Sequence, residues 1–429
     1  VLAALPQAWA SLRGALLELA SLFRTVAGER RRDVTGELIS ERANAAEVRA
    51  FTAQRILLAE HRRISAELAE DAVRVGRRKN VLVTVGRALG ALGALAGYLV
   101  LGLLLYTGGI ALALAGTAVV AMRAAAQAVG NGVYSVNELY EIGIYVELYR
   151  ECLADIRRRR RRAPTDRLNG DPQVIELTDV SFRYPGQDRD AVTGISLSVR
   201  AGEVIALVGE NGSGKSTLAK LITGLYLPVE GTVRWDGVGT DTVDPAELHE
   251  RIAMVMQEPL RWPMSAENNI RIGRLERADP EGAAFAAAAS RSGADAVLND
   301  LPGGEQTLLS PAFHNGRDLS GGQWQRISVA RGLYRDAAVV VADEPTSAMD
   351  ARAEHAVFTA LRALSTDPAG GRSRITVLIT HRLANVRHAD KIVVLEHGQV
   401  TEQGTHRQLI DRQGMYHQLF RLQAHAYRP

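Results

Sequence analysis

The fold of the C-terminal half follows from nine residues, Gly209-Glu210-Asn211-Gly212-Ser213-Gly214-Lys215-Ser216-Thr217, which match the phosphate-binding pattern G-x-x-x-x-G-K-[ST]. An apolar run, Val204–Val208, precedes them, and a helical pattern, Ser216–Thr223, follows. A glycine-rich loop between a strand and a helix is typical of nucleotide-binding α/β folds. The sequence therefore predicts a strand, a phosphate-binding loop and a helix in this order.

The residue types in this loop suit a triphosphate. Glycines allow backbone N–H groups to curl around phosphate oxygens, and the start of the following helix adds partial positive charge. Lys215 is expected to reach the β- and γ-phosphates, and the Ser216 hydroxyl to ligate Mg²⁺. The loop residues predicted to bind ATP are Gly209, Asn211, Gly212, Ser213, Gly214, Lys215, Ser216 and Thr217.

From about Asp171 onward, short β-branched runs alternate with helical patterns, which indicates an α/β domain. One run, Ala338–Asp343, is apolar on both faces, like a strand of a parallel sheet covered by helices. It delivers Asp343 and Glu344, where one carboxylate can hold the Mg²⁺ shell and the next can orient the attacking water. The predicted strands are Val174–Phe182, Gly194–Val199, Val204–Val208, Ala338–Asp343, Ile375–Thr380 and Ile392–Leu395.

A second motif, Leu319-Ser320-Gly321-Gly322-Gln323, lies between the phosphate loop and Asp343. With this motif, residues 172–429 resemble the ATP-binding-cassette (ABC) family, whose signature it matches. Ser320 and two glycines at a helix N-terminus form a further anion site. In the family, that site binds the γ-phosphate held by the opposite domain. The resemblance therefore implies a second nucleotide-binding domain as partner. The signature residues expected to contact the partner's ATP are Leu319, Ser320, Gly321, Gly322 and Gln323.

The same resemblance implies roles elsewhere in the domain. Tyr184 matches the aromatic residue that stacks on adenine, and Gln257 matches the Q-loop glutamine that senses Mg²⁺ and the γ-phosphate. Ser347 and Asp350 match the D-loop, and His381 matches the switch histidine that contacts the γ-phosphate. The implied cofactors are ATP and Mg²⁺. The implied catalytic residues are Glu344, His381 and Gln257, and the implied Mg²⁺ ligands are Ser216, Gln257 and Asp343.

The N-terminal half contains two long apolar segments. Val81–Tyr106 is 26 residues long with a single charge, which exceeds the ~20 residues needed to cross a hydrocarbon core. After the turn signal Thr107-Gly108-Gly109, a second segment, Ile110–Met122, runs into Arg123. The basic run Arg77–Lys79 and Arg123 place both outer ends in the cytoplasm by the positive-inside rule. A buried helical hairpin is the alternative, although a soluble core helix seldom runs so long without a polar face.

Helical patterns also cover residues 1–26 and 34–78. Glu41–Phe51 resembles the cytoplasmic loop between the fourth and fifth spans of exporter-type ABC transporters, and the expected turn at Ala27–Glu37 resembles its coupling helix. In this register Val1 lies within the fourth span, so about three and a half spans are expected to precede these residues. The predicted domains are a partial transmembrane domain at 1–160, a linker at 161–172 and a nucleotide-binding domain at 173–429.

Composition narrows the expected partners. A single cysteine, Cys152, excludes an internal disulfide framework. The basic runs flank apolar segments and lack the interleaved aromatic residues of single-strand binders, so no nucleic acid is expected. One departure from the exporter pattern is that Ser310–Arg317, before the signature, carries no acidic residue. Contacts with the coupling helices are therefore expected to differ.

The predicted fold class is a membrane α-helical domain of partial ABC exporter type plus an α/β P-loop NTPase domain with a helical signature subdomain. The expected function is ATP-driven export by a multi-pass subunit of the cell (inner) membrane, with its nucleotide-binding domain in the cytoplasm. The expected partners are a second half-transporter, identical or different, membrane lipid, and a peptide, drug or lipid-like cargo. The alternative is a non-transporting ABC ATPase, or a truncated remnant that hydrolyses ATP without translocation.

Overall fold

The structure, a computed structural model, describes residues 5–159, 163–349, 351–365 and 373–426. The chain divides into two compact units, Val1–Arg160 and Arg161–Pro429. We refer to them as the N-terminal and C-terminal units and describe each by itself.

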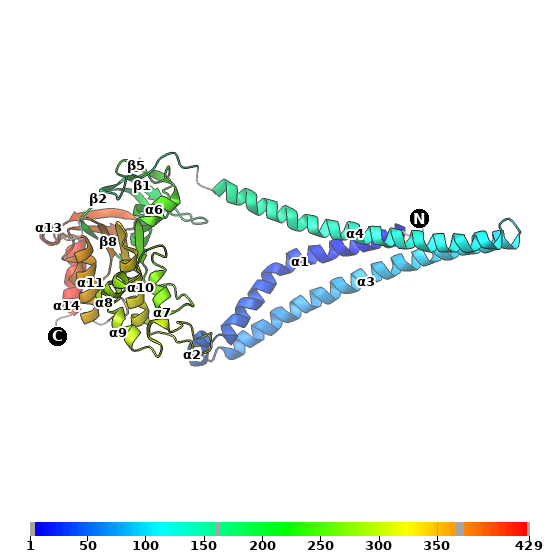
Figure 1. The fold of residues 1–429 in the computed structure, drawn as a ribbon, viewed down its shortest axis with the longest axis horizontal. Helices are drawn as coiled ribbons and strands as arrows, with labels where there is room; N and C mark the ends of the chain where they lie inside the picture. Colours follow the sequence, from blue (N-terminus) through cyan, green and yellow to red (C-terminus); the bar gives the residue numbers. More distant parts are fainter. Residues whose placement is uncertain (1–4, 160–162, 350, 366–372, 427–429) are drawn as a thin grey trace. The chain divides into compact units, whose positions relative to one another are not determined.

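The N-terminal unit is built from three long helices, and Figure 1 shows two of them, α1 and α3, side by side. They run antiparallel, because Glu18 pairs with Lys79 at 2.7 Å and the Ser21 hydroxyl donates to Asp71 at 2.5 Å. The helices of this unit are α1 (Leu5–Ser40), the 3-10 turn η2 (Arg42–Asn44), α2 (Ala45–Ala50), α3 (Gln54–Tyr106) and α4 (Leu112–Arg159).

The turn expected at Ala27–Glu37 is wrong, because α1 continues through it to Ser40. No proline interrupts this segment, and its two glycines, Gly28 and Gly36, each cost a helix only about 1 kcal/mol. Gly28 also faces α3 closely, since a Cβ there would lie 3.2 Å from Leu68 Cδ2. The chain turns instead at residues 41–53, and the short helix of this connection is α2.

The turn predicted after the first apolar segment is confirmed. Helix α3 ends at Tyr106, Gly108 has a φ of +72°, and α4 begins at Leu112. Both α3 and α4 contain an apolar stretch long enough to cross a membrane. Large apolar side chains such as Leu99 and Leu103 are exposed along α3, as is typical of a helix face that requires an apolar surrounding.

The C-terminal unit contains two β-sheets with helices around them. The smaller is antiparallel with the strand order β2-β1-β4-β5. The strands predicted at Val174–Phe182 and Gly194–Val199 belong to this antiparallel sheet, not to the parallel one. The strands of the unit are β1 (Val174–Phe182), β2 (Val192–Arg200), β3 (Val204–Val208), β4 (Glu230–Trp235), β5 (Val238–Gly239), β6 (Ile252–Val255), β7 (Val339–Asp343), β8 (Ile375–Ile379), β9 (Lys391–Glu396) and β10 (Gln399–Gly404).

The larger sheet positions the candidate site. Its strand order is β10-β9-β3-β8-β7-β6, and all neighbours except β10 and β9 are parallel. Strands β3, β7 and β8 are buried on both faces, because helices and the small sheet cover them. Since parallel strands end at one edge, the loops that follow β3, β6, β7 and β8 meet there.

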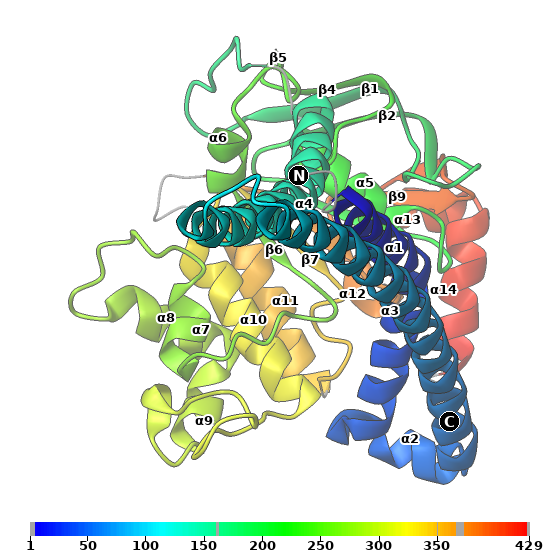
Figure 2. The same cartoon turned by 90° about the vertical axis from the view of Figure 1, so that its right-hand side faces the viewer.

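Helices α7, α8, α9 and α10 gather in one part of the unit, apart from α13 and α14 (Figure 2). Their arrangement matches the predicted helical signature subdomain, because the signature lies at the start of α10. The helices are α5 (Lys215–Ile222), α6 (Pro245–Glu250), α7 (Ala266–Arg271), α8 (Ala283–Ser292), α9 (Ala294–Asn299), η3 (Gly304–Gln306), α10 (Gly321–Arg335), α11 (Ala351–Ser365), α12 (Leu383–Val386), α13 (His406–Asp411) and α14 (Met415–Ala426).

Candidate functional site

The phosphate-binding loop joins β3 to α5, as predicted, and two of its glycines lie against neighbouring backbone. A Cβ on Gly209 would lie 2.2 Å from the Leu395 carbonyl oxygen, and one on Gly214 would lie 2.6 Å from that of Ala191. Both glycines also have positive φ values, +154° and +99°. Any larger residue at either position would push the loop open. The loop therefore keeps a tight curve with its N–H groups at the carboxyl edge of the sheet.

Lys215 lies inside this curve. Its ammonium group donates to the carbonyl oxygens of Gly209, at 3.0 Å, and Glu210, at 2.7 Å. Burial lowers the pKa of Lys215, while the negative charges of Glu344 and Asp343 act in the opposite direction. The ammonium is thus largely buried and held by loop carbonyls, which a phosphate oxygen can replace.

The residues expected to bind Mg²⁺ converge only in part. The side chain of Ser216, in α5, lies near the carboxylate of Asp343 at the end of β7 and acts to lower its pKa. Burial raises the pKa of Asp343, and Ser216 opposes this shift. A hydroxyl and a buried carboxylate are hard oxygen donors that fit Mg²⁺. Gln257 is exposed in the loop after β6, whose last residue pairs with Ala342 of β7.

Glu344 and His381 are brought into contact from two adjacent strands. Glu344 follows β7 and His381 follows β8, and Glu344 Oε1 lies 3.2 Å from His381 Nδ1. The Glu344 side chain is 13% exposed and that of His381 is 55% exposed. Glu344 also has a φ of +46°, which its N–H bond to the Ile379 carbonyl at 2.8 Å helps to hold. A carboxylate held in a fixed but accessible position suits the orientation of a water molecule.

Tyr184 lies over the phosphate-binding loop. Its hydroxyl hydrogen-bonds to that of Thr217 at 3.0 Å, and its ring makes edge contacts with Phe182 and Tyr226, with centroids 5.1 and 5.9 Å apart. Lys220 in turn lies 5.1 Å from the centroid of the Tyr226 ring. The aromatic residue expected near adenine is therefore tied to α5, beside the loop that is predicted to hold the phosphates.

The signature forms the N-terminus of α10. The Ser320 hydroxyl accepts from the Gln323 N–H at 3.3 Å, and the Gln323 side chain accepts from the Ser320 N–H at 2.9 Å. This reciprocal capping box accounts for the presence of Gln323 in the motif, and it requires no contact between Gln323 and a nucleotide. Gly322 lies against the D-loop, since a Cβ there would be 2.7 Å from the Ala348 carbonyl oxygen.

Gln325, which the sequence did not single out, ties the signature helix to the D-loop. Its amide donates to the Ser347 hydroxyl at 2.5 Å and accepts from the Ala348 N–H at 2.9 Å. The side chain is only 3% exposed, and a buried polar residue of this kind is expected to be fully hydrogen-bonded. In the sequence alone, a glutamine on the inner face of an amphipathic helix gives only a weak indication of such a link. The predicted D-loop residue Asp350 lies outside the described residues.

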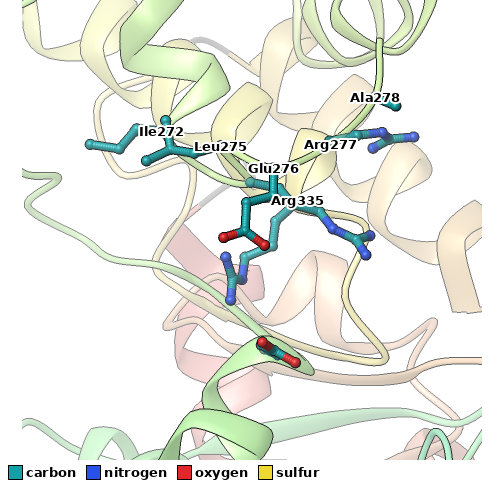
Figure 3. A pocket seen from close by; sticks show the side chains of 8 residues that line it. Ile272, Leu275, Glu276, Arg277, Ala278 and Arg335 are labelled. Carbon is teal, nitrogen blue, oxygen red and sulfur yellow. The ribbon is translucent and has the colours of Figure 1, made fainter.

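A cavity of about 600 Å³ lies elsewhere in the unit. It is bordered by the segment between α7 and α8, including Leu275 and Glu276, and by Arg335 (Figure 3). Arg335 ends α10 while the signature begins it, so about 20 Å of helix separates the two at 1.5 Å per residue. None of the predicted ATP-site residues lines this cavity, and its size does not make it the nucleotide site.

Comparison with known proteins agrees with these motifs. A family model described as "ABC transporter" matches residues 192–347. The chain is 39% identical over 258 residues to the ATP-dependent lipid A-core flippase of Ralstonia nicotianae, and 38% identical over 258 residues to that of Escherichia coli. Each alignment covers 60% of this chain and 42% of the relative. The chain therefore spans less than half the length of these curated relatives.

The match to a solved structure extends over both units. A structure described as that of a bacterial Atm1-family ABC exporter with ATP bound covers 99% of this chain, which covers 72% of that one, with 26% identity and a TM-score of 0.74. The predicted fold class is thereby confirmed. The chain carries an ABC transporter domain and has the exporter-type arrangement, in which a helical N-terminal region and a nucleotide-binding domain share one chain.

Proposed function

We propose that this chain binds and hydrolyses Mg-ATP as one half of a pair of ABC nucleotide-binding domains, and that hydrolysis drives export across a membrane. One observation supports ATP binding and hydrolysis. Lys215, Asp343 and the contacting pair Glu344 and His381 lie together at one edge of the parallel sheet. These groups supply a cation for the phosphates, a metal-binding carboxylate and a water-orienting carboxylate. Phosphoryl transfer needs mainly such positioning and charge neutralisation.

The reaction follows from these positions. On ATP binding, phosphate oxygens replace the carbonyls of Gly209 and Glu210 as acceptors for the Lys215 ammonium. Ser216, Asp343 and Gln257 would hold Mg²⁺, which would supply positive charge to the phosphates. Glu344 orients the attacking water. His381 Nδ1 faces Glu344, which leaves its Nε2 for the γ-phosphate.

The signature completes the site of a second domain. The contacts of Ser320–Gln323 run within α10 and to Ala348 of the D-loop. The N-terminus of α10 thus remains available as an anion site, and it serves ATP held by the partner. Gln325 links α10, whose N-terminus serves the partner's ATP, to Ser347, which lies four residues after Asp343. The partner is a second half-transporter, either a copy of this chain or a different one.

Transport is supported by the helical N-terminal unit and by the names of the relatives. Helices α3 and α4 have apolar stretches of membrane-spanning length, and the basic flanks favour a cytoplasmic nucleotide-binding domain. Two relatives are named as lipid A-core flippases, which favours a lipid-like cargo over a peptide or a drug. We place the protein in the cell (inner) membrane as a multi-pass subunit.

The hydrolysis proposal is tested by Glu344→Gln in the full chain in washed membranes. We expect the rate of phosphate release to fall by about 100-fold or more, while ATP binding persists. Glu176→Gln, on an exposed position of β1, is the matched control and should behave like wild type. Hydrolysis near the wild-type rate in Glu344→Gln would refute the role of Glu344. Release of the chain from membranes by an alkaline wash would favour a non-transporting ABC ATPase.

A further inference from the structure

One side chain from the last helix of the described chain forms two hydrogen bonds to the backbone of the loop that carries His381. Gln423, in α14, donates its side-chain amide to the His381 carbonyl oxygen. Its amide oxygen accepts from the Leu383 N–H at 2.9 Å. A primary amide carries both a donor and an acceptor, so one Gln423 side chain can serve both groups at the same time. The two bonds lie on either side of Arg382 and hold the backbone from His381 to Leu383.

Helix α14 is itself held firmly to the domain. Tyr416 near its start is fully buried, and its hydroxyl hydrogen-bonds to His406 Nδ1 at 2.8 Å. The rings of Tyr416, His406 and Phe420 pack together. The carboxylate of Glu402 accepts from the backbone N–H groups of Met415 and Tyr416, which caps the helix N-terminus. Gln423 therefore lies about 10 Å along the helix from Tyr416, where the helix is anchored.

The same loop is also held from α11. The buried carboxylate of Glu354 accepts from the Arg382 guanidinium and from the Asn385 side chain, the latter at 2.5 Å. The Arg382 N–H donates to the Thr380 hydroxyl at 3.0 Å. The backbone around His381 is thus fixed from two elements, whereas the imidazole remains 55% exposed. Such an arrangement positions a ring without enclosing it.

We propose that Gln423 is a positioning residue for His381, so that the C-terminal helix sets the rate of ATP hydrolysis by holding the switch-histidine loop. This inference rests on the proposed function and adds to it a residue that does not touch nucleotide. Loss of the amide leaves the His381 carbonyl and the Leu383 N–H without these partners, and the loop gains freedom. The imidazole then spends less time in the position that serves the γ-phosphate.

The test compares the full chain in membranes or nanodiscs as wild type, Gln423→Leu and Gln423→Glu. Leucine keeps the size and removes both bonds, whereas glutamate keeps only an acceptor for the Leu383 N–H. We expect kcat for ATP hydrolysis to fall about fivefold to tenfold in Gln423→Leu and less in Gln423→Glu, with KM for ATP changed less than twofold. Gln418→Leu, the same change at an exposed position of α14, is the matched control and should leave kcat unchanged.

Two readouts separate positioning from a purely structural role. In a His381→Ala background, Gln423→Leu should change the residual rate, followed with radiolabelled ATP, by less than twofold. Hydrogen exchange of the peptide containing Leu383 should be faster in Gln423→Leu than in Gln418→Leu. A wild-type kcat in Gln423→Leu, or an equal fold-loss with and without His381, overturns the inference while the proposed function stands. Absence of hydrolysis by the wild-type chain overturns both.

Discussion

The buried amide of Gln325 offers a quantitative test of the link between the signature helix and the D-loop. Gln325→Leu keeps the approximate volume and removes the bonds to the Ser347 hydroxyl and the Ala348 N–H. Leaving a buried donor or acceptor unsatisfied costs about 1–3 kcal/mol, and leucine regains part of this by burying more apolar surface. We therefore expect a loss of about 2–4 kcal/mol in the free energy of unfolding of the C-terminal unit.

This loss can be measured by thermal unfolding and resolved by a double-mutant cycle. At about 2–4 °C per kcal/mol for a domain of this size, Gln325→Leu should lower the Tm by roughly 4–16 °C. Ser347→Ala removes one of the two bonds and should have a smaller effect. Because the two residues share that bond, the double variant should be no less stable than Gln325→Leu alone, with a coupling of about 1 kcal/mol. Additive effects of the two substitutions would refute the account.

Two further predictions concern the residues around the signature. Gly322→Ala should destabilise the unit by about 1–3 kcal/mol, because its Cβ would lie 2.7 Å from the Ala348 carbonyl oxygen. The control Gly321→Ala should be close to neutral in thermal unfolding, because its Cβ would lie 3.5 Å from the Ala348 side chain. Hydrogen bonding to the Trp324 indole lowers the pKa of Asp318 in the fold, so its stabilising contribution is present above the unfolded pKa and is lost as pH falls through the folded pKa. Asp318→Asn should therefore flatten the acid dependence of stability below about pH 4, and an unchanged slope would contradict this.

The strands that were predictable from sequence are the apolar ones with clear boundaries. Val174–Phe182 and Val204–Val208 match β1 and β3 residue for residue, because turn-forming residues follow both, and apolar residues are interspersed with polar ones in β1 and run continuously in β3. Strand β10, Gln399–Gly404, was missed because it is polar at alternate positions and lies at the sheet edge. The nature of the sheet around β1 was also not predictable, since pairing partners lie far along the chain.

The residues of the candidate site likewise divide into those with a local sequence signal and those without one. Motifs with fixed local spacing, such as Gly209–Thr217, lie where predicted because one strand and one helix determine their geometry. Gln325 and Gln423 had no comparable signal. Their bonds reach residues 22 and 42 positions away, and a glutamine within a helix is ordinarily a solvent-facing residue. The turn at Ala27–Glu37, expected from the resemblance to the exporter coupling helix, is absent because α1 continues to Ser40 and packs against α3.

The central claim, that ATP held by one domain is completed by the signature of another, is tested most directly by mixing two variants. Lys215→Met removes the phosphate-binding cation, and Ser320→Arg blocks the signature. Each variant chain, purified alone and reconstituted in nanodiscs, should hydrolyse ATP at a small fraction of the wild-type rate. Co-expressed as mixed pairs, they should recover a substantial part of it, because one composite site then contains an intact Lys215 and an intact Ser320. Near-wild-type hydrolysis by Ser320→Arg alone would contradict the composite site.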